Sequence, residues 1–152
     1  MVITSEISVK KILKEDIGKY VGFAFEGDNE LVEKFHFADT TLEETVASNV
    51  KNIIELSEKI DLDCYAVYWR ENVIGFFVMA YHNSMLYSFG INKQYRVKEV
   101  LMDWVEFVKS ISSEYLVCPL NAENKRAINF FIKNGMEVLS EDENIVTLIL
   151  KQ

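Results

Sequence analysis

The chain has few of the residues that mark flexible linkers, disulfide frameworks or metal sites. Its 152 residues include one proline, six dispersed glycines, two cysteines and two histidines. No low-complexity tract, internal repeat or Gly/Ser-rich linker interrupts it, so we expect one domain over residues 1–152. Hydrophobic residues make up 49% of the chain, which is enough to bury a substantial core.

The cysteines and histidines do not form a known metal or catalytic motif. Cys64 and Cys118 have no CxxC companion, and His36 and His82 lack a suitably spaced cysteine or carboxylate. GxSxG, HExxH and Walker-type loops are also missing. We therefore expect no metal site, and we interpret both cysteines as small buried hydrophobic residues in a reducing compartment.

Charge and hydropathy narrow the class of partner. The net charge is −8 with a pI of about 4.8, which disfavours nucleic acids and anionic membranes as partners because both need a positive surface. An acidic surface suits a cationic or amine-bearing partner, although it also serves simple solubility. No run reaches membrane-spanning length, and the opening MVITSEISVKKILKED resembles neither a signal nor a transit peptide. We expect a cytoplasmic protein.

Hydrophobic periodicity predicts alternating strands and helices. The first half contains a strand from residue 7 to 12, an ambiguous and mainly helical stretch over 16–38 with a break at Gly27, and a helix over 41–60. Thr41 and Glu44 form a capping box at the start of that helix. Three antiparallel strands are then expected over 64–70, 73–81 and 84–91, with Glu71-Asn72 as the first turn and His82 in the second.

The second half begins with the most regular helical pattern. One face of residues 96–111 is apolar at steps of three and four: Val97, Val100, Leu101, Trp104, Val105, Val108 and Ile111. A strand over 114–118 follows, then a helix capped by Asn121 or Asn124 and ended by Gly135, and strands over 136–139 and 145–150 parted by a charged turn at 140–143. The crossover through the helix predicts an α/β protein with a mixed, mostly antiparallel sheet flanked by helices.

Two stretches resemble motifs of the GNAT superfamily of acyl-CoA-dependent N-acyltransferases. FGINKQYRVKEVLMDWV is similar to the family's fourth strand, pyrophosphate-binding turn and following helix, and NAENKRAINFFIKNGMEV is similar to its N-xx-A-xx-hydrophobic-Tyr-xxx-G-F motif. The resemblance covers residues 65–150, and the earlier part only by element order. It implies the GNAT fold, acetyl-CoA as acyl donor and an amine of a small molecule or protein as acceptor; a homodimer is possible within the family.

The resemblance also implies a set of cofactor-binding residues. Backbone N–H groups around Ile91 and Asn92 would stabilise the oxyanion, and the turn and helix start at Arg96, Val97, Lys98, Glu99, Val100 and Leu101 would hold the pyrophosphate. In the second motif, Asn124 would reach the pantetheine arm, Ala127 would let the helix lie close to it, and Phe131 would lie near the sulfur. An alternative stays open in which Asn124 only caps a helix and Ala127 only packs in the core.

The pyrophosphate turn departs from the family pattern. Val97, Glu99 and Leu101 occupy its glycine positions, and Glu99 brings a negative charge to a helix end that attracts anions. A local excess of basic residues compensates: Lys93, Arg96, Lys98, Lys125, Arg126 and Lys133. These side chains could equally be solvated helix-end charges.

The catalytic positions are also altered. Tyr87 stands where the family has a glutamate base, and it is the candidate catalytic residue, although a phenol with a pKa near 10 is a poor base at neutral pH. Phe131 replaces the tyrosine that protonates the leaving thiolate.

Three functions fit these residues. The first is an N-acetyltransferase that uses acetyl-CoA. The second is a GNAT-fold binding or structural module that has lost catalysis, as in some viral and phage proteins, and the third is a sensor that binds CoA without turnover. For a cofactor slot to exist, the strand over 84–91 must splay from the strand that follows the helix.

Overall fold

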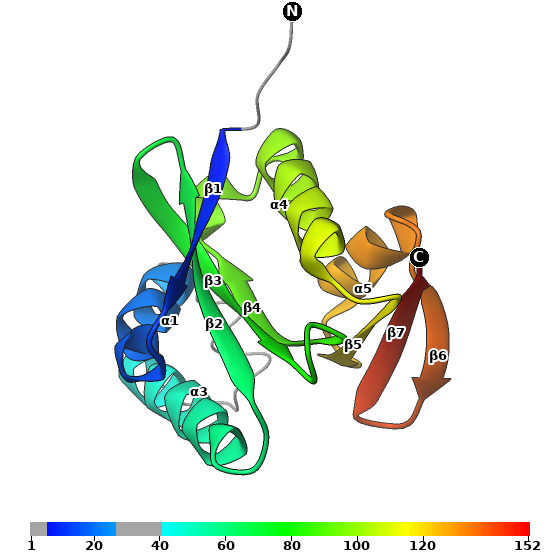
Figure 1. Cartoon of the computed structure of the whole chain (residues 1–152), viewed down its shortest axis with the longest axis horizontal. Coiled ribbons are helices and arrows are strands. Elements are labelled where there is room, and N and C mark those ends of the chain that lie inside the picture. Colours follow the sequence, from blue (N-terminus) through cyan, green and yellow to red (C-terminus); the bar gives the residue numbers. More distant parts are fainter. Residues whose placement is uncertain (1–5, 27–40) are drawn as a thin grey trace, which may run out of the picture.

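The computed structural model describes residues 6–26 and 41–152, and it contains a seven-stranded mixed sheet flanked by helices (Figure 1). The strand order is β1-β2-β3-β4-β5-β7-β6. The elements of the first half are β1 (Ile7–Ile12), η1 (Lys14–Asp16), α1 (Ile17–Phe25), α3 (Leu42–Ser57), β2 (Leu62–Trp69), β3 (Asn72–Ala80) and β4 (Met85–Ile91). Those of the second half are η2 (Lys93–Tyr95), α4 (Lys98–Ile111), β5 (Tyr115–Asn121), α5 (Lys125–Lys133), β6 (Glu137–Glu141) and β7 (Ile145–Lys151). The predicted fold class is confirmed.

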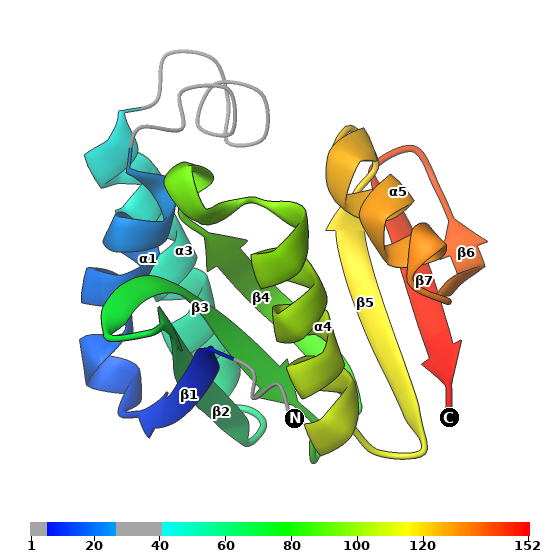
Figure 2. The same cartoon turned by 90° about the horizontal axis from the view of Figure 1, so that it is seen from above.

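Helices cover both faces of the strands β2, β3 and β4. α1 and α3 pack on one face and α4 on the other, while α5 lies beside β5 and β7 (Figures 1 and 2). Successive residues of a strand point to opposite faces, so Phe76 and Val78 enter the core under α1 and α3, whereas Phe77 and Met79 enter the core under α4. A strand buried on both sides needs a continuous apolar run, and β3 has one.

The helix ends follow local chemistry. Thr41 Oγ1 accepts a hydrogen bond from the backbone N–H of Glu44 at 3.1 Å, as the capping motif predicts. Asn124, not Asn121, caps α5, because its side-chain oxygen accepts from the Ala127 N–H at 3.3 Å. Gly135 has a φ of 101°, a conformation that favours glycine, and it ends α5 as expected.

Several predicted boundaries were wrong by a few residues. The first hairpin turn is Arg70-Glu71, because Asn72 already pairs with Trp69 in the β2–β3 ladder. β5 runs on to Asn121, three residues beyond the expected end. β6 continues to Glu141, so the last turn lies at 142–144 and not at 140–143.

The remaining boundary predictions concern the two helices before β2. α1 covers only Ile17–Phe25 of the predicted helical stretch, and the expected break at Gly27 and the residue His36 lie outside the described residues. α3 ends at Ser57, close to the predicted end. His82 lies in the β3–β4 turn as predicted, with a φ of 56°.

Neither cysteine takes part in a disulfide. Cys64 and Cys118 are both buried and free, as interpreted from the sequence. Among residues 6–26 and 41–152, no three His, Cys, Asp or Glu side chains gather where they could hold a metal ion. Within the same residues, no helix is both long and apolar enough to cross a membrane.

Candidate functional site

The sheet opens between β4 and β5, which are its only parallel neighbours among the described strands. The two strands pair only at Met85 and Val117, near their amino ends, where the Val117 N–H donates to the Ser84 carbonyl at 2.8 Å. Beyond that point no further pair joins them, and they diverge toward their carboxyl ends (Figure 2). The predicted splay between these strands is confirmed.

Two local features favour the opening. Val117 directs its backbone N–H toward β4, and the backbone N–H of a residue two positions later in a strand points in the same direction. That residue is Pro119, which has no N–H, so the separation of β4 from β5 leaves no donor unpaired at this position. On β4, Tyr87 is the extra residue of a bulge, because Leu86 and Ser88 pair with consecutive residues of β3. A bulge bends the strand that carries it, and here it lies where β4 turns away from β5.

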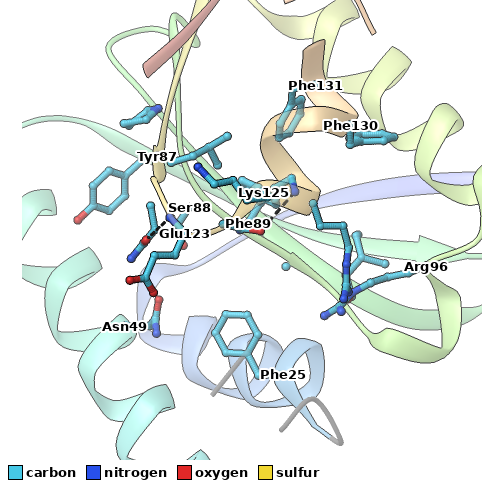
Figure 3. A pocket seen from close by; sticks show the side chains of 18 of the residues that line it. Phe25, Asn49, Tyr87, Ser88, Phe89, Arg96, Glu123, Lys125, Phe130 and Phe131 are labelled. Carbon is cyan, nitrogen blue, oxygen red and sulfur yellow. Dashed lines mark hydrogen bonds between the residues drawn. The ribbon is translucent and has the colours of Figure 1, made fainter. Parts of the chain in front are cut away.

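The opening leads into a cavity of about 750 Å³ (Figure 3). Its walls come from α1, α3, β4, the first half of α4, β5, α5 and the first residue of β7. The inner wall is aromatic: the Phe89 ring lies 5.5 Å from that of Phe131 and 5.4 Å from that of Trp104. These rings make the inner wall of the cavity apolar.

One end of the cavity is cationic. Arg96 lines it and is held in place because its Nε donates to the Ile91 carbonyl at 2.8 Å. Lys125 and Arg126, at the amino end of α5, line the cavity as well. Lys93, Lys98 and Lys133 do not line it, and Lys133 stands at the far end of α5. The predicted basic cluster therefore divides into three residues at the cavity and three outside it.

The amino end of α4 adds backbone donors beside Arg96. The first intrahelical bond runs from the Leu101 N–H to the Val97 carbonyl, so the N–H groups of residues 98–100 have no acceptor within the helix. Val97 provides no side-chain cap. Such an end attracts anions through its N–H groups and the helix dipole.

The residues at the family's glycine positions fit this arrangement without strain. Val97 has a φ of −109° and exposes its side chain, so its backbone conformation does not require glycine. Glu99 is also exposed, and neither residue lines the cavity. Leu101 does line it, and it is the one residue of the three that narrows the slot.

The end of β4 carries the two backbone N–H groups expected to stabilise an oxyanion, and the Asn92 N–H is already used there. The Asn92 N–H donates to the Ile74 carbonyl at 2.7 Å, and its side chain bonds Phe23 and Gln94, so Asn92 anchors the strand end and its N–H is already used. Alternate residues of an antiparallel strand direct their N–H groups to opposite neighbours. The Ile91 N–H therefore faces away from β3, toward the gap.

The predicted site residues divide into two groups. Seven line the cavity: Tyr87, Ile91, Arg96, Leu101, Asn124, Ala127 and Phe131. Five lie outside its lining: Asn92, Val97, Lys98, Glu99 and Val100. Asn124 uses its side-chain oxygen as a cap, but its side-chain N–H₂ has no acceptor among the described residues. A cap and a ligand contact are therefore compatible in this side chain.

The side chains at the two altered positions, Tyr87 and Phe131, neither accept nor donate a proton at neutral pH. Burial, and then the nearby carboxylate of Glu55, raise the pKa of Tyr87 above its usual value of 10.0, so the phenol stays protonated at neutral pH and cannot act as a base. Phe131 is 1% exposed and packs against Phe89, Trp104 and Phe130. It contributes shape to the slot and no proton.

Sequence reasoning missed the polar residues at the other end of the cavity. Asn49 and Asn52 come from α3, and Glu123 comes from the loop between β5 and α5. Asn49 and Asn52 carry no sequence signal, because asparagines on a surface helix are common. The position of Glu123 directly before the helix cap Asn124 was the only available clue.

Comparison with known proteins gives structural matches only. No protein-family profile and no curated protein sequence matches the chain. An acetyltransferase from Thermus thermophilus superposes with a TM-score of 0.75 at 11% identity, with 100% of each chain covered. The PaiA N-acetyltransferase from Thermoplasma acidophilum, in complex with coenzyme A, has a TM-score of 0.65 at 15% identity, covering 96% of this chain and 99% of its own.

A third match has a protein substrate. The acetyltransferase from Salmonella typhimurium that modifies the N-terminal serine of ribosomal protein L7/L12 superposes with a TM-score of 0.67 at 10% identity, covering 98% of this chain and 96% of its own. The splayed β4 and β5 and the helix order of the chain agree with these matches. The chain has the fold of the GNAT acetyltransferases.

Proposed function

We propose that the chain is a cytoplasmic N-acyltransferase that moves an acetyl group from acetyl-CoA to an amine. The observation that carries this proposal is the gap between β4 and β5, which opens into a cavity of about 750 Å³ with a cationic end at Arg96. Cavities of this size suit a cofactor-sized ligand. An acyl-CoA would supply an acyl group activated as a thioester.

The residues around the cavity suit the parts of such a cofactor. Arg96, Lys125 and the N–H groups that begin α4 would hold the phosphates. The side-chain N–H₂ of Asn124 and the small Ala127 would accommodate the pantetheine arm along α5. The Ile91 N–H would donate to the carbonyl oxygen as negative charge develops there.

The missing general acid limits the rate less than it would in other reactions. A thiol with a pKa of roughly 8.5 leaves as a thiolate without much assistance, so Phe131 in place of a proton donor is compatible with turnover. The backbone N–H of Ile91 does not depend on side-chain identity, so the altered side chains at positions 87 and 131 would not remove this donor to the oxyanion.

A non-catalytic CoA-binding module is the second candidate, and the protonated Tyr87 and buried Phe131 favour it. Calorimetric titration with acetyl-CoA and with CoA tests the shared part of both proposals. The position of the ligand is tested by comparing the acetyl-CoA affinities of two matched variants. Lys125→Ala removes a lysine at the cavity, and Lys133→Ala removes one at the far end of α5. We expect only Lys125→Ala to weaken binding, by about 1 kcal/mol.

Turnover then separates the two candidates. Release of free thiol from acetyl-CoA in the presence of a panel of primary amines would support the transferase. Binding without turnover across the panel would favour the module, and the absence of any acetyl-CoA binding would refute both.

A further inference from the structure

The end of the cavity opposite Arg96 carries a second, acidic subsite. Glu123 is the only acidic side chain among the described residues that line the cavity. Figure 3 shows its side chain and that of Asn49 pointing toward each other, one from the β5–α5 loop and the other from α3. Arg96 lies on the other side of the same view, and Lys125 is labelled between the two, so the carboxylate of Glu123 and the guanidinium of Arg96 lie at different ends of the cavity.

The loop that carries Glu123 is held by its own backbone. The Asn121 side-chain oxygen accepts from the Glu123 N–H at 2.9 Å, and the Asn121 carbonyl accepts from the Asn124 N–H at 2.9 Å. The Glu123 carbonyl accepts from the Lys125 N–H at 2.8 Å. These bonds fix the direction in which the Glu123 side chain leaves the loop.

The two facing groups each present a hydrogen-bond acceptor without a donor among the described residues: the Glu123 carboxylate and the Asn49 side-chain oxygen. The Asn49 Nδ2 uses one of its two N–H groups to donate to the Thr45 carbonyl of its own helix at 2.8 Å, and the Asn49 Oδ1 accepts a hydrogen bond from no described residue. The Glu123 carboxylate accepts only, and no described residue forms a hydrogen bond or an ion pair with it. One cationic group with several N–H donors can therefore bond both acceptors at once.

We propose that Glu123 and Asn49 bind the acceptor as its ammonium ion, which makes the acceptor a cationic primary amine; the bound ion releases one proton to water before its nitrogen attacks the thioester. An ammonium group has three N–H donors and a positive charge, and it therefore satisfies a carboxylate and an amide oxygen together. Phe25 and Ile53 line the cavity nearby, and Ile53 lies one helical turn after Asn49 on the same face of α3. These apolar neighbours suit an amine carried on an aliphatic or aromatic frame.

This inference rests on the proposed transferase function, but it is tested separately from it. The probe is n-butylammonium, titrated into the whole chain with and without acetyl-CoA and followed by NMR shifts of the Asn49 side-chain amide. The wild type should bind it saturably, and Glu123→Gln should weaken binding about tenfold or more, because the charge-assisted bond is lost. Glu137→Gln makes the same change on exposed β6, outside the cavity, and should have no effect.

Two further probes separate charge from apolar contact. n-Butanol keeps the carbon chain without the charge, and n-butyltrimethylammonium keeps the charge without N–H donors, so both should bind more weakly than n-butylammonium. Equal binding of n-butanol, equal affinity in Glu123→Gln, or no saturable binding by the wild type would each overturn the inference. Failure of acetyl-CoA to bind, with n-butylammonium binding still dependent on Glu123, would refute the transferase and leave the amine subsite standing.

Discussion

Gly75 on β3 tests how closely the strand that carries the site must approach its neighbour. It pairs with Ile91 at the end of β4. A Cβ at this position would collide with the Gly90 carbonyl oxygen and would stand 3.0 Å from the Ile91 Cα. Both are backbone atoms of the ladder and cannot rotate away, so Gly75→Ala must push β4 outward.

The magnitude follows from two opposing contributions. Overpacking in a rigid core costs about 1–3 kcal/mol. The substitution also stiffens the unfolded chain, which returns about 0.4–1 kcal/mol. The steric contribution dominates here because the obstacle is backbone, and we expect Gly75→Ala to lower the free energy of unfolding by at least about 1 kcal/mol.

Gly22 in α1 offers a control with the opposite sign. A Cβ there would meet Val46 Cγ2 at 3.8 Å, an ordinary van der Waals contact, and the residue lies inside a helix. Gly22→Ala should therefore raise the free energy of unfolding by about 0.5–1 kcal/mol.

Urea unfolding followed by circular dichroism measures both variants, and titration with acetyl-CoA adds a functional readout. Gly75→Ala should also weaken acetyl-CoA binding, because it displaces the segment that carries the Ile91 N–H, whereas Gly22→Ala should leave affinity unchanged. Wild-type stability in Gly75→Ala, or the same sign of change in both variants, would refute the reasoning.

Three further predictions concern single side chains. In an active transferase, Phe131→Tyr should raise turnover by less than about a hundredfold, and most at low pH, because a proton donor then helps the thiolate leave. In a binding module, the buried hydroxyl should only lower the free energy of unfolding, by about 1–3 kcal/mol. An unchanged rate together with unchanged stability contradicts both hypotheses. Glu99→Gln should tighten acetyl-CoA binding about twofold at low salt, because it removes a negative charge from the start of α4, while the control Glu137→Gln should leave the affinity unchanged. If calorimetry gives both variants the same affinity for acetyl-CoA, the phosphates do not bind at the start of α4. Burial raises the pKa of Cys64 to about 11 and raises that of Cys118 as well, so both thiols should resist Ellman's reagent at pH 8 in the native protein and react after unfolding; rapid native reaction would show that the core opens.

Short-range patterns in the chain determine much of the fold. The apolar face of α4 is buried at Val100, Trp104 and Val108, at the spacing that the sequence predicts. Thr41 caps α3, and Gly135 ends α5. Each of these features depends on residues within about two turns of one another, where side-chain spacing and backbone conformation act directly.

The site depends on contacts between segments that are distant in the chain. The Asn92 N–H is used by Ile74, which removes one expected oxyanion donor, and no local pattern shows which strand a given N–H will face. Lys125 and Lys133 are both lysines of α5, but they lie at its opposite ends, and only Lys125 lines the cavity. Glu123 and Asn49 line the same cavity because the splay of β4 and β5 lets α3 and the β5–α5 loop face the same space. Packing of whole helices against the sheet decides such distances, and only the tertiary structure contains that information.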